Sequence, residues 1–280
     1  MAELTAHTRQ TLKVPSGGRW FTNKRPALEL LTNEDQFVVA WDKNKEGAKV
    51  FGIYTTFEDF WTHYLKNKPD ERWGYEIVLH DKPVKFHMDI EYWTDEPDSE
   101  HTKIRMVTAW RRHCLTSLYK RQPEIYVMCG TRPDNGKIKN SYHLVIDNYV
   151  CANNKEDGTM KEIYRIMQGL GDEWQTIKPG KDKPQCIVDD SICSADRCMR
   201  LLLSSKLGKN YPFYCLTEDA ITMTSFASHK IPTTCTTQSC STSQTQTKTG
   251  TAYSLSSSRA RLRRSRGLSE SGPSESGGSW

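Results

Sequence analysis

The sequence predicts a globular body that mixes strands and helices and is followed by a polar tail. In Val84–Trp93, apolar and polar residues alternate, which is typical of a strand with one face against a core. In Lys103–Arg121, apolar residues recur at helical spacing and predict an amphipathic helix. The C-terminal stretch is rich in Thr, Ser and Gln and then in Arg, so it buries too little apolar surface to offset its ordering entropy. We therefore expect a polar lead-in over residues 1–26, a folded domain over residues 27–220 and a disordered tail over residues 221–280.

The remaining elements follow from local patterns. Strands are predicted where β-branched and aromatic residues lie between turn residues. One helix is marked by Thr56 as its N-cap, by Glu58 and Asp59 in its first turn, and by one face of aromatic residues. In chain order we expect a helix at Ala27–Leu31, strands at Phe37–Trp41 and Val50–Tyr54, the helix capped by Thr56, strands at Tyr75–Leu79, Val84–Trp93, Ile125–Cys129 and Lys139–Ile146, a helix at Lys161–Leu170, and strands at Cys186–Val188 and Met199–Leu203.

Charge and cysteine content restrict the class of protein. The net charge of +5 lies entirely in the tail, because the first 220 residues hold 32 basic and 32 acidic side chains. A neutral body argues against a generally basic coat for nucleic acid, although a local basic cleft is still compatible with it. The nine cysteines include no Cys-x-x-Cys pair, and neither Cys193/Cys198 nor Cys235/Cys240 has a second pair nearby, so we expect reduced thiols and no zinc site. Without an apolar N-terminal run or a span of about 20 apolar residues, we expect an intracellular protein with no membrane contact.

The polar face of Val84–Trp93 carries Asp89 and Glu91. In a strand their side chains point the same way, roughly 6–7 Å apart. Two carboxylates aimed at one point repel each other, and a divalent cation is the usual means of neutralising them. The alternative is a solvated face of an antiparallel sheet, on which Asp-x-Glu pairs are common.

Two further polar groups lie at predicted strands or strand ends. Ser141 and His143 share one face of their strand, and Asp189 is followed by a set of basic residues: Arg197, Arg200 and Lys206. Each has a plain structural reading, as a core histidine, a turn cap or surface charges. Taken together with Asp89 and Glu91, they form the inventory of two-metal phosphoryl transfer. Three carboxylates can hold two divalent ions, and the Ser, His and basic side chains can bind a triphosphate.

These motifs, in this order, resemble the archaeo-eukaryotic primase superfamily. Asp-x-Glu is followed about fifty residues later by Ser-x-His, and then by the stretch Val188–Lys209, which contains Arg-x-x-Arg-Leu and Ser-Ser-Lys-Leu-Gly-Lys. The resemblance covers roughly residues 37–212 and is greatest to the PrimPol branch, which is related to herpesvirus-type primases. It implies an α+β primase fold, with a small N-terminal α/β module packed on an RRM-like catalytic sheet and the active site in the cleft between them.

The resemblance also implies roles for residues. Asp89, Glu91 and Asp189 would be catalytic and would bind two Mg²⁺ or Mn²⁺ ions. Nucleotide or phosphate contacts would come from seven other residues: Lys139, Ser141, His143, Arg197, Arg200, Lys206 and Lys49. The activity implied is that of a DNA primase and DNA-directed polymerase acting in replication, repriming or damage tolerance. Its partners would be a single-stranded DNA template, nucleoside triphosphates and replication single-strand-binding proteins, and a monomer in the nucleus or mitochondrion is expected.

The sequence departs from the PrimPol pattern in two respects. The tail offers Cys235 and Cys240 with only His229 nearby, instead of the Cys/His zinc motif of that branch, and the body ends soon after the third motif, which is compatible with truncation. Two other functions therefore stay open. One is a metal-dependent nuclease or phosphoesterase that uses the same carboxylates. The other is a truncated, non-catalytic module that binds single-stranded nucleic acid.

Overall fold

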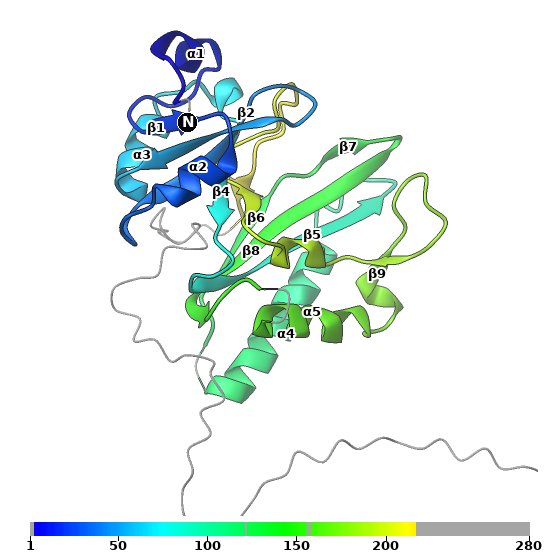
Figure 1. Ribbon diagram of the computed structural model, residues 1–280. Coiled ribbons are helices and arrows are strands. Elements are labelled where there is room, and N and C mark those ends of the chain that lie inside the picture. Colours follow the sequence, from blue (N-terminus) through cyan, green and yellow to red (C-terminus); the bar gives the residue numbers. More distant parts are fainter. Residues whose placement is uncertain (1–2, 121, 156–157, 217–280) are drawn as a thin grey trace, which may run out of the picture. The chain divides into compact units, whose positions relative to one another are not determined.

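Two large antiparallel sheets, one two-stranded sheet and flanking helices make up the part of the chain that the computed structural model describes, residues 3–120, 122–155 and 158–216 (Figure 1). The predicted tail over residues 221–280 lies outside these ranges. The mixed α/β class expected from the sequence is confirmed. None of the described helices is long and apolar enough to cross a membrane.

The first sheet has the strand order β1-β3-β2-β4-β11. Aromatic residues of α3 (Phe57–Tyr64) cover one face of it, and Thr56 caps this helix as predicted. Helix α2 (Lys24–Glu29) lies on the other face, where Ala27 packs with Phe21 and Ile53. The strands are β1 (Arg19–Phe21), β2 (Phe37–Asp42), β3 (Lys49–Tyr54), β4 (Gly74–Val78) and β11 (Arg197–Arg200).

Part of the segment expected to form a lead-in belongs to this sheet, as strand β1. Short helix α1 (Ala6–Thr11) precedes β1, and Trp20 of β1 is fully buried. The Trp20 ring meets the rings of Trp41 and Tyr54 edge-on, with centroids 6.3 and 6.2 Å apart. A strand of three residues is too short to show a periodic pattern, and the residues around Trp20 are polar. The burial of Trp20 therefore could not be predicted from the local sequence.

The second sheet has the order β12-β6-β8-β5, with the short strand β7 (Arg132–Asp134) paired to β8. Its long central pair is β5 (Val84–Thr94) and β8 (Lys137–Cys151), beside β6 (Ile125–Cys129) and β12 (Tyr214–Cys215). Helices α4 (Thr102–Tyr119) and α5 (Thr159–Gln168) lie along one face of this sheet (Figure 1). The predicted inward residues of β5 pack with these helices in the largest core cluster, which confirms the alternation: Val84, Phe86, Met88, Ile90 and Tyr92.

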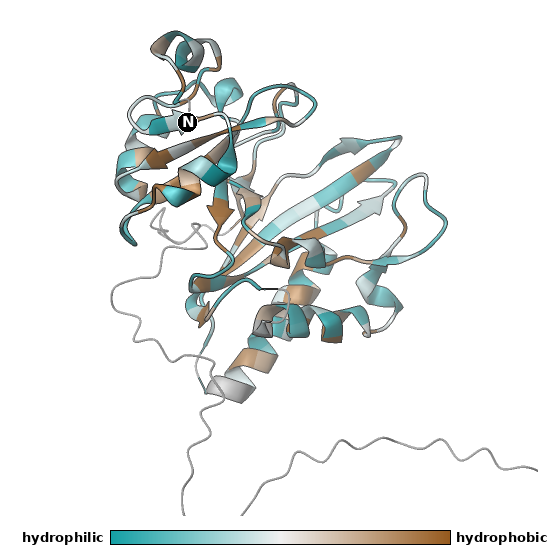
Figure 2. Cartoon of the chain, viewed as in Figure 1, coloured by the Kyte–Doolittle hydropathy of each residue, from teal (hydrophilic) through white to brown (hydrophobic). Residues whose placement is uncertain are grey.

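The opposite face of β5 is only partly open. Lys85 and His87 are fully buried, whereas Asp89 and Glu91 keep 22% and 24% of their side-chain surface. Hydrophobic and hydrophilic residues accordingly mix along β5 and β8 (Figure 2). The polar face of β5 therefore opens to solvent toward the end that carries the two carboxylates.

The chain after α5 differs from the prediction in detail. After the 3-10 helix η2 (Asp172–Trp174), the strands β9 (Gln175–Thr176) and β10 (Gln185–Cys186) form a small hairpin, so the expected strand at Cys186–Val188 is shorter. A second 3-10 helix, η3 (Asp190–Cys193), precedes β11, and a third, η1 (Pro69–Glu71), precedes β4. The last predicted strand is shifted toward the N-terminus and ends at Arg200. Leu203 adopts a left-handed φ of 63°, which is incompatible with a continuing strand.

Candidate active site

The pairing of β5 with β8 places the first two motifs side by side. The register sets Asp89 opposite His143, Glu91 opposite Ser141 and Trp93 opposite Lys139. Directly opposed residues of an antiparallel pair point to the same face of a sheet. Asp89, Glu91, Ser141, His143 and Lys139 therefore form one polar patch on the sheet face turned away from α4 and α5.

The backbone brings the third motif to the same place. Asp189 donates its N–H to the carbonyl of Asp89 over 2.9 Å, and Glu91 donates its N–H to the carbonyl of Ile187 over 2.7 Å. An isolated bridge between Ile90 and Val188 lies between these bonds. Asp189 also accepts a hydrogen bond from the N–H of Ser191 over 2.9 Å and so caps η3. Asp189 therefore caps a turn, as the purely structural alternative predicts, and it also lies next to Asp89.

The negative charges of Glu91 and Asp89 are neutralised to different degrees. The Lys139 ammonium lies 2.5 Å from an Oε of Glu91. Asp89 has a buried Oδ1 without a hydrogen-bond partner, and the nearest cation-forming group is His143, whose Nε2 is 3.9 Å away. Burial, followed by the negative charges of Glu91 and Asp189, raises the pKa of Asp89 well above its usual range.

Three basic residues from other segments, Arg132, Arg200 and Lys206, contribute positive charge to the electrostatics of this patch. Partial burial and the charges of Arg200, Arg132 and Lys139 lower the pKa of Lys206 to about 8. Burial and the charge of Arg200 lower the pKa of Arg132, which Glu91 and Asp89 partly restore. Arg132 lies opposite Lys139 in the pairing of β7 with β8, and the like-charge effects indicate that Arg200 and Lys206 are neighbours of these two cations. Burial and Arg200 also lower the pKa of His143 well below its usual range, so its imidazole is neutral at pH 7.

Two predicted phosphate-binding residues are engaged with other side chains. Arg197 is exposed at the start of β11 and donates a hydrogen bond to the Ser191 hydroxyl over 2.9 Å. Lys49 pairs with the Asp42 carboxylate and lies 3.8 Å from the centroid of the Tyr75 ring. Of the ten predicted site residues, the structure brings eight together: Asp89, Glu91, Asp189, Lys139, Ser141, His143, Arg200 and Lys206.

Sequence reasoning missed two residues of this neighbourhood. Arg132 lies opposite Lys139 because the hairpin of β7 and β8 turns through Asn135 and Gly136, both with positive φ. An Asn-Gly pair between two strands is a strong signal for such a two-residue turn, and it would have fixed this register. Phe213 stacks on the His143 ring with centroids 4.1 Å apart, and no local sequence pattern predicts this contact.

The donor set is compatible with divalent cations, although the side chains do not form a closed coordination sphere. Among the described residues, no group of three or more His, Cys, Asp or Glu side chains is close enough to constitute a metal centre as it stands. Asp89 nevertheless presents a buried oxygen that lacks a hydrogen-bonding partner, and the Lys139 ammonium pairs with Glu91 at the place where a metal cation would bind. Oxygen ligands of this kind suit Mg²⁺ and Mn²⁺.

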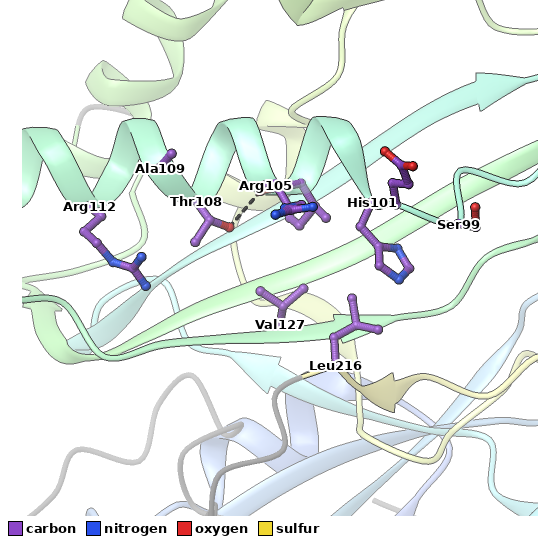
Figure 3. A pocket seen from close by; sticks show the side chains of 10 residues that line it. Ser99, His101, Arg105, Thr108, Ala109, Arg112, Val127 and Leu216 are labelled. Carbon is purple, nitrogen blue, oxygen red and sulfur yellow. Dashed lines mark hydrogen bonds between the residues drawn. The ribbon is translucent and has the colours of Figure 1, made fainter.

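A separate pocket of 880 Å³ lies on the other side of the second sheet, against α4 (Figure 3). Its lining includes Arg105 and Arg112 of α4, Val127 of β6 and Leu216. None of the lining residues belongs to the carboxylate patch, so this pocket is distinct from the candidate active site.

Comparison with known proteins identifies the family to which the chain belongs. The family model described as "C962R protein N-terminal AEP domain" matches residues 48–218, which is more than half of the chain. No curated protein matches the chain. AEP denotes archaeo-eukaryotic primase, a superfamily of primase/polymerase-type nucleotidyltransferases. The matched range begins one residue before β3 and contains the polar patch and its basic neighbours. Because the match spans more than half of the chain, this chain belongs to the archaeo-eukaryotic primase superfamily, within the C962R-type AEP family.

Proposed function

We propose that the protein is a DNA-directed primase/polymerase of the PrimPol type, which performs template-dependent nucleotidyl transfer on single-stranded DNA. The observation that carries this proposal is the β5/β8 register, which sets Asp89 and Glu91 against His143 and Ser141 with Asp189 joined through the backbone. This arrangement puts acidic groups for cations next to polar and basic groups for a triphosphate, as phosphoryl transfer requires. The RRM-like description of the second sheet is part of the same proposal, and the two helices on one of its faces support it.

Asp89, Glu91 and Asp189 would hold two divalent ions. When bound, such ions lower the pKa of an attacking hydroxyl and stabilise the negative charge of a leaving pyrophosphate. The protein prepares this site by keeping Asp89 beside two other carboxylates. The Lys139 ammonium neutralises Glu91, and it can turn to a phosphate oxygen when Glu91 binds a metal ion instead.

The remaining side chains would bind the nucleotide. His143 is neutral, so it contributes a hydrogen bond without adding positive charge. Arg200, Arg132 and Lys206 supply the positive charge that a triphosphate and a template backbone need. Because the template would be bound mainly through its phosphates, its affinity should fall as salt concentration rises.

Incubation with single-stranded DNA, labelled nucleotides and Mn²⁺ or Mg²⁺ tests this function. The unprimed template is used first and a primed template second, in each case beside Asp89→Asn and Asp95→Asn. The second variant is the matched control, because Asp95 follows β5 but is 87% exposed. Synthesis by the wild type and by Asp95→Asn, together with its loss in Asp89→Asn, is the expected result. Degradation of the DNA without incorporation would instead favour a nuclease, and metal-independent binding without either reaction would favour a non-catalytic module.

A further inference from the structure

Phe213 ends the loop that connects the two sheets. The loop leaves β11 of the first sheet and enters β12 of the second. Two backbone hydrogen bonds close its base: Leu203 donates its N–H to the Phe213 carbonyl over 2.7 Å, and Phe213 donates its N–H to the Ser204 carbonyl over 3.1 Å. The Ser204 hydroxyl accepts the N–H of Gly74 in β4 over 3.0 Å, so the base of the loop is fixed to the first sheet.

The fully buried Phe213 ring is in contact with two residues of the candidate active site. It stacks on the His143 imidazole with centroids 4.1 Å apart and an interplanar angle of 25°. The guanidinium carbon of Arg200 lies 4.9 Å from the centroid of the same ring, within the range of a cation–π contact. One apolar side chain therefore touches a residue of the second sheet and a residue of the first.

Gly130, immediately after β6, makes room for this ring. A Cβ atom added to Gly130 would lie 2.9–3.0 Å from three atoms at the outer end of the ring, Cζ, Cε1 and Cε2. Gly130 also donates its N–H to the carbonyl of Ser141 over 2.8 Å. The position of the Phe213 ring is therefore fixed at its outer end by backbone that is itself bonded to the Ser-x-His segment.

From these contacts we propose that Phe213 is a positioning residue, which holds the His143 imidazole and the Arg200 guanidinium in the geometry that binds the triphosphate. The proposal rests on the proposed function, because it takes His143 and Arg200 as nucleotide-binding groups. Phe213 itself offers no polar atom to a substrate. Its effect is to restrict two polar side chains that come from different sheets, so that nucleotide binding does not have to order them.

The test compares Phe213→Leu with Phe86→Leu. Phe86 is a matched control, since it is equally buried and belongs to the same core cluster but lies on the helix-facing side of β5. In primer extension, Phe213→Leu should raise KM for the deoxynucleoside triphosphate about three- to tenfold, the size of one aromatic contact, and leave kcat within about twofold. Phe86→Leu should lower thermal stability without changing KM. Equal KM values for the two variants, both folded, would overturn the proposal.

A second readout does not depend on activity. The His143 side chain is 6% exposed, so its reaction with diethylpyrocarbonate, followed by peptide mass spectrometry, should be slow in the wild type. Phe213→Leu should make His143 react several-fold faster, and Phe86→Leu should not. Gly130→Ala, which displaces the Phe213 ring without removing it, should also make His143 react faster. This variant replaces Phe213→Leu in the test if Phe213→Leu does not fold. Unchanged His143 reactivity in both site variants would overturn the positioning role, whereas altered reactivity in a protein without polymerase activity would support it and contradict only the proposed function.

Discussion

Replacing Asp89 with Asn should make the metal-free protein more stable at neutral pH. Burial and the charges of Glu91 and Asp189 raise the pKa of Asp89, so ionising this carboxyl group costs more free energy in the folded state than in the unfolded state. Asn keeps the shape of the side chain without the charge. The backbone carbonyl of residue 89, which accepts the N–H of Asp189, is unaffected by the change.

The magnitude follows from the strand geometry. Residues 89 and 91 of one strand lie about 6.6 Å apart. At an effective dielectric constant of about 20, two unit charges at that distance repel each other by about 2–3 kcal/mol, and the Lys139 ammonium beside Glu91 offsets part of this repulsion. In a domain of this size each kcal/mol changes Tm by about 2–4 °C, so Asp89→Asn should raise Tm by at most about 12 °C.

The pH dependence has a defined sign. Between the ordinary pKa of about 4 and its raised value, the folded protein binds more protons at Asp89 than the unfolded chain does. The wild type therefore loses stability as the pH rises through this window, and Asp89→Asn does not. The two proteins should have similar Tm values near pH 4 and should diverge toward pH 8.

The assay is thermal unfolding, monitored by circular dichroism, in EDTA at several pH values from 4 to 8. Asp95→Asn, which removes an exposed charge, should leave Tm unchanged. Adding Mn²⁺ should stabilise the wild type and have little effect on Asp89→Asn. If Asp89→Asn is less stable than the wild type at pH 7 in EDTA, the Asp89 carboxylate makes a net stabilising contact and the prediction is wrong.

Two further predictions concern other parts of the fold. Trp20→Ala should lower the free energy of unfolding by about 3–5 kcal/mol in a urea titration, because the Trp20 side chain is fully buried against Trp41 and Tyr54; a change below 1 kcal/mol would mean that β1 is not part of the stable sheet. Because the pKa of Lys206 is lowered to about 8, its ammonium is present at pH 7 and is lost as the pH rises to 9. KM for the nucleotide should therefore rise over this interval in the wild type and stay flatter in Lys206→Arg, whereas identical profiles would exclude a role for the Lys206 charge in binding.

The local patterns predicted most elements and the polar face of β5. Alternation in β5 separates Asp89 and Glu91 from the core residues, and the same period of two places Ser141 and His143 together on β8. These are properties of single strands, so they can be obtained from the sequence alone. The register that sets His143 against Asp89 joins strands about fifty residues apart, and a period of two does not determine it.

The features that were missed depend on tertiary contacts. Trp20 lies in a strand of three residues, and Phe213 lies outside any periodic element, so neither has a local signature. Arg197 and Arg200 follow the same motif, but the structure separates them, because residues three apart in a strand point to opposite faces. Arg132 is an exception, since the Asn135-Gly136 turn could have placed it opposite Lys139 from the sequence alone.

Nucleotide selection by the template distinguishes a template-directed polymerase from a nuclease or a binding module. The protein is given a homopolymeric single-stranded DNA template, Mn²⁺ and each labelled nucleotide in turn, with and without a short primer. The wild type should incorporate the complementary nucleotide only, and Asp89→Asn should be folded and form no such product. Incorporation that ignores the template, shortening of the template without incorporation, or full activity in Asp89→Asn would each contradict this prediction.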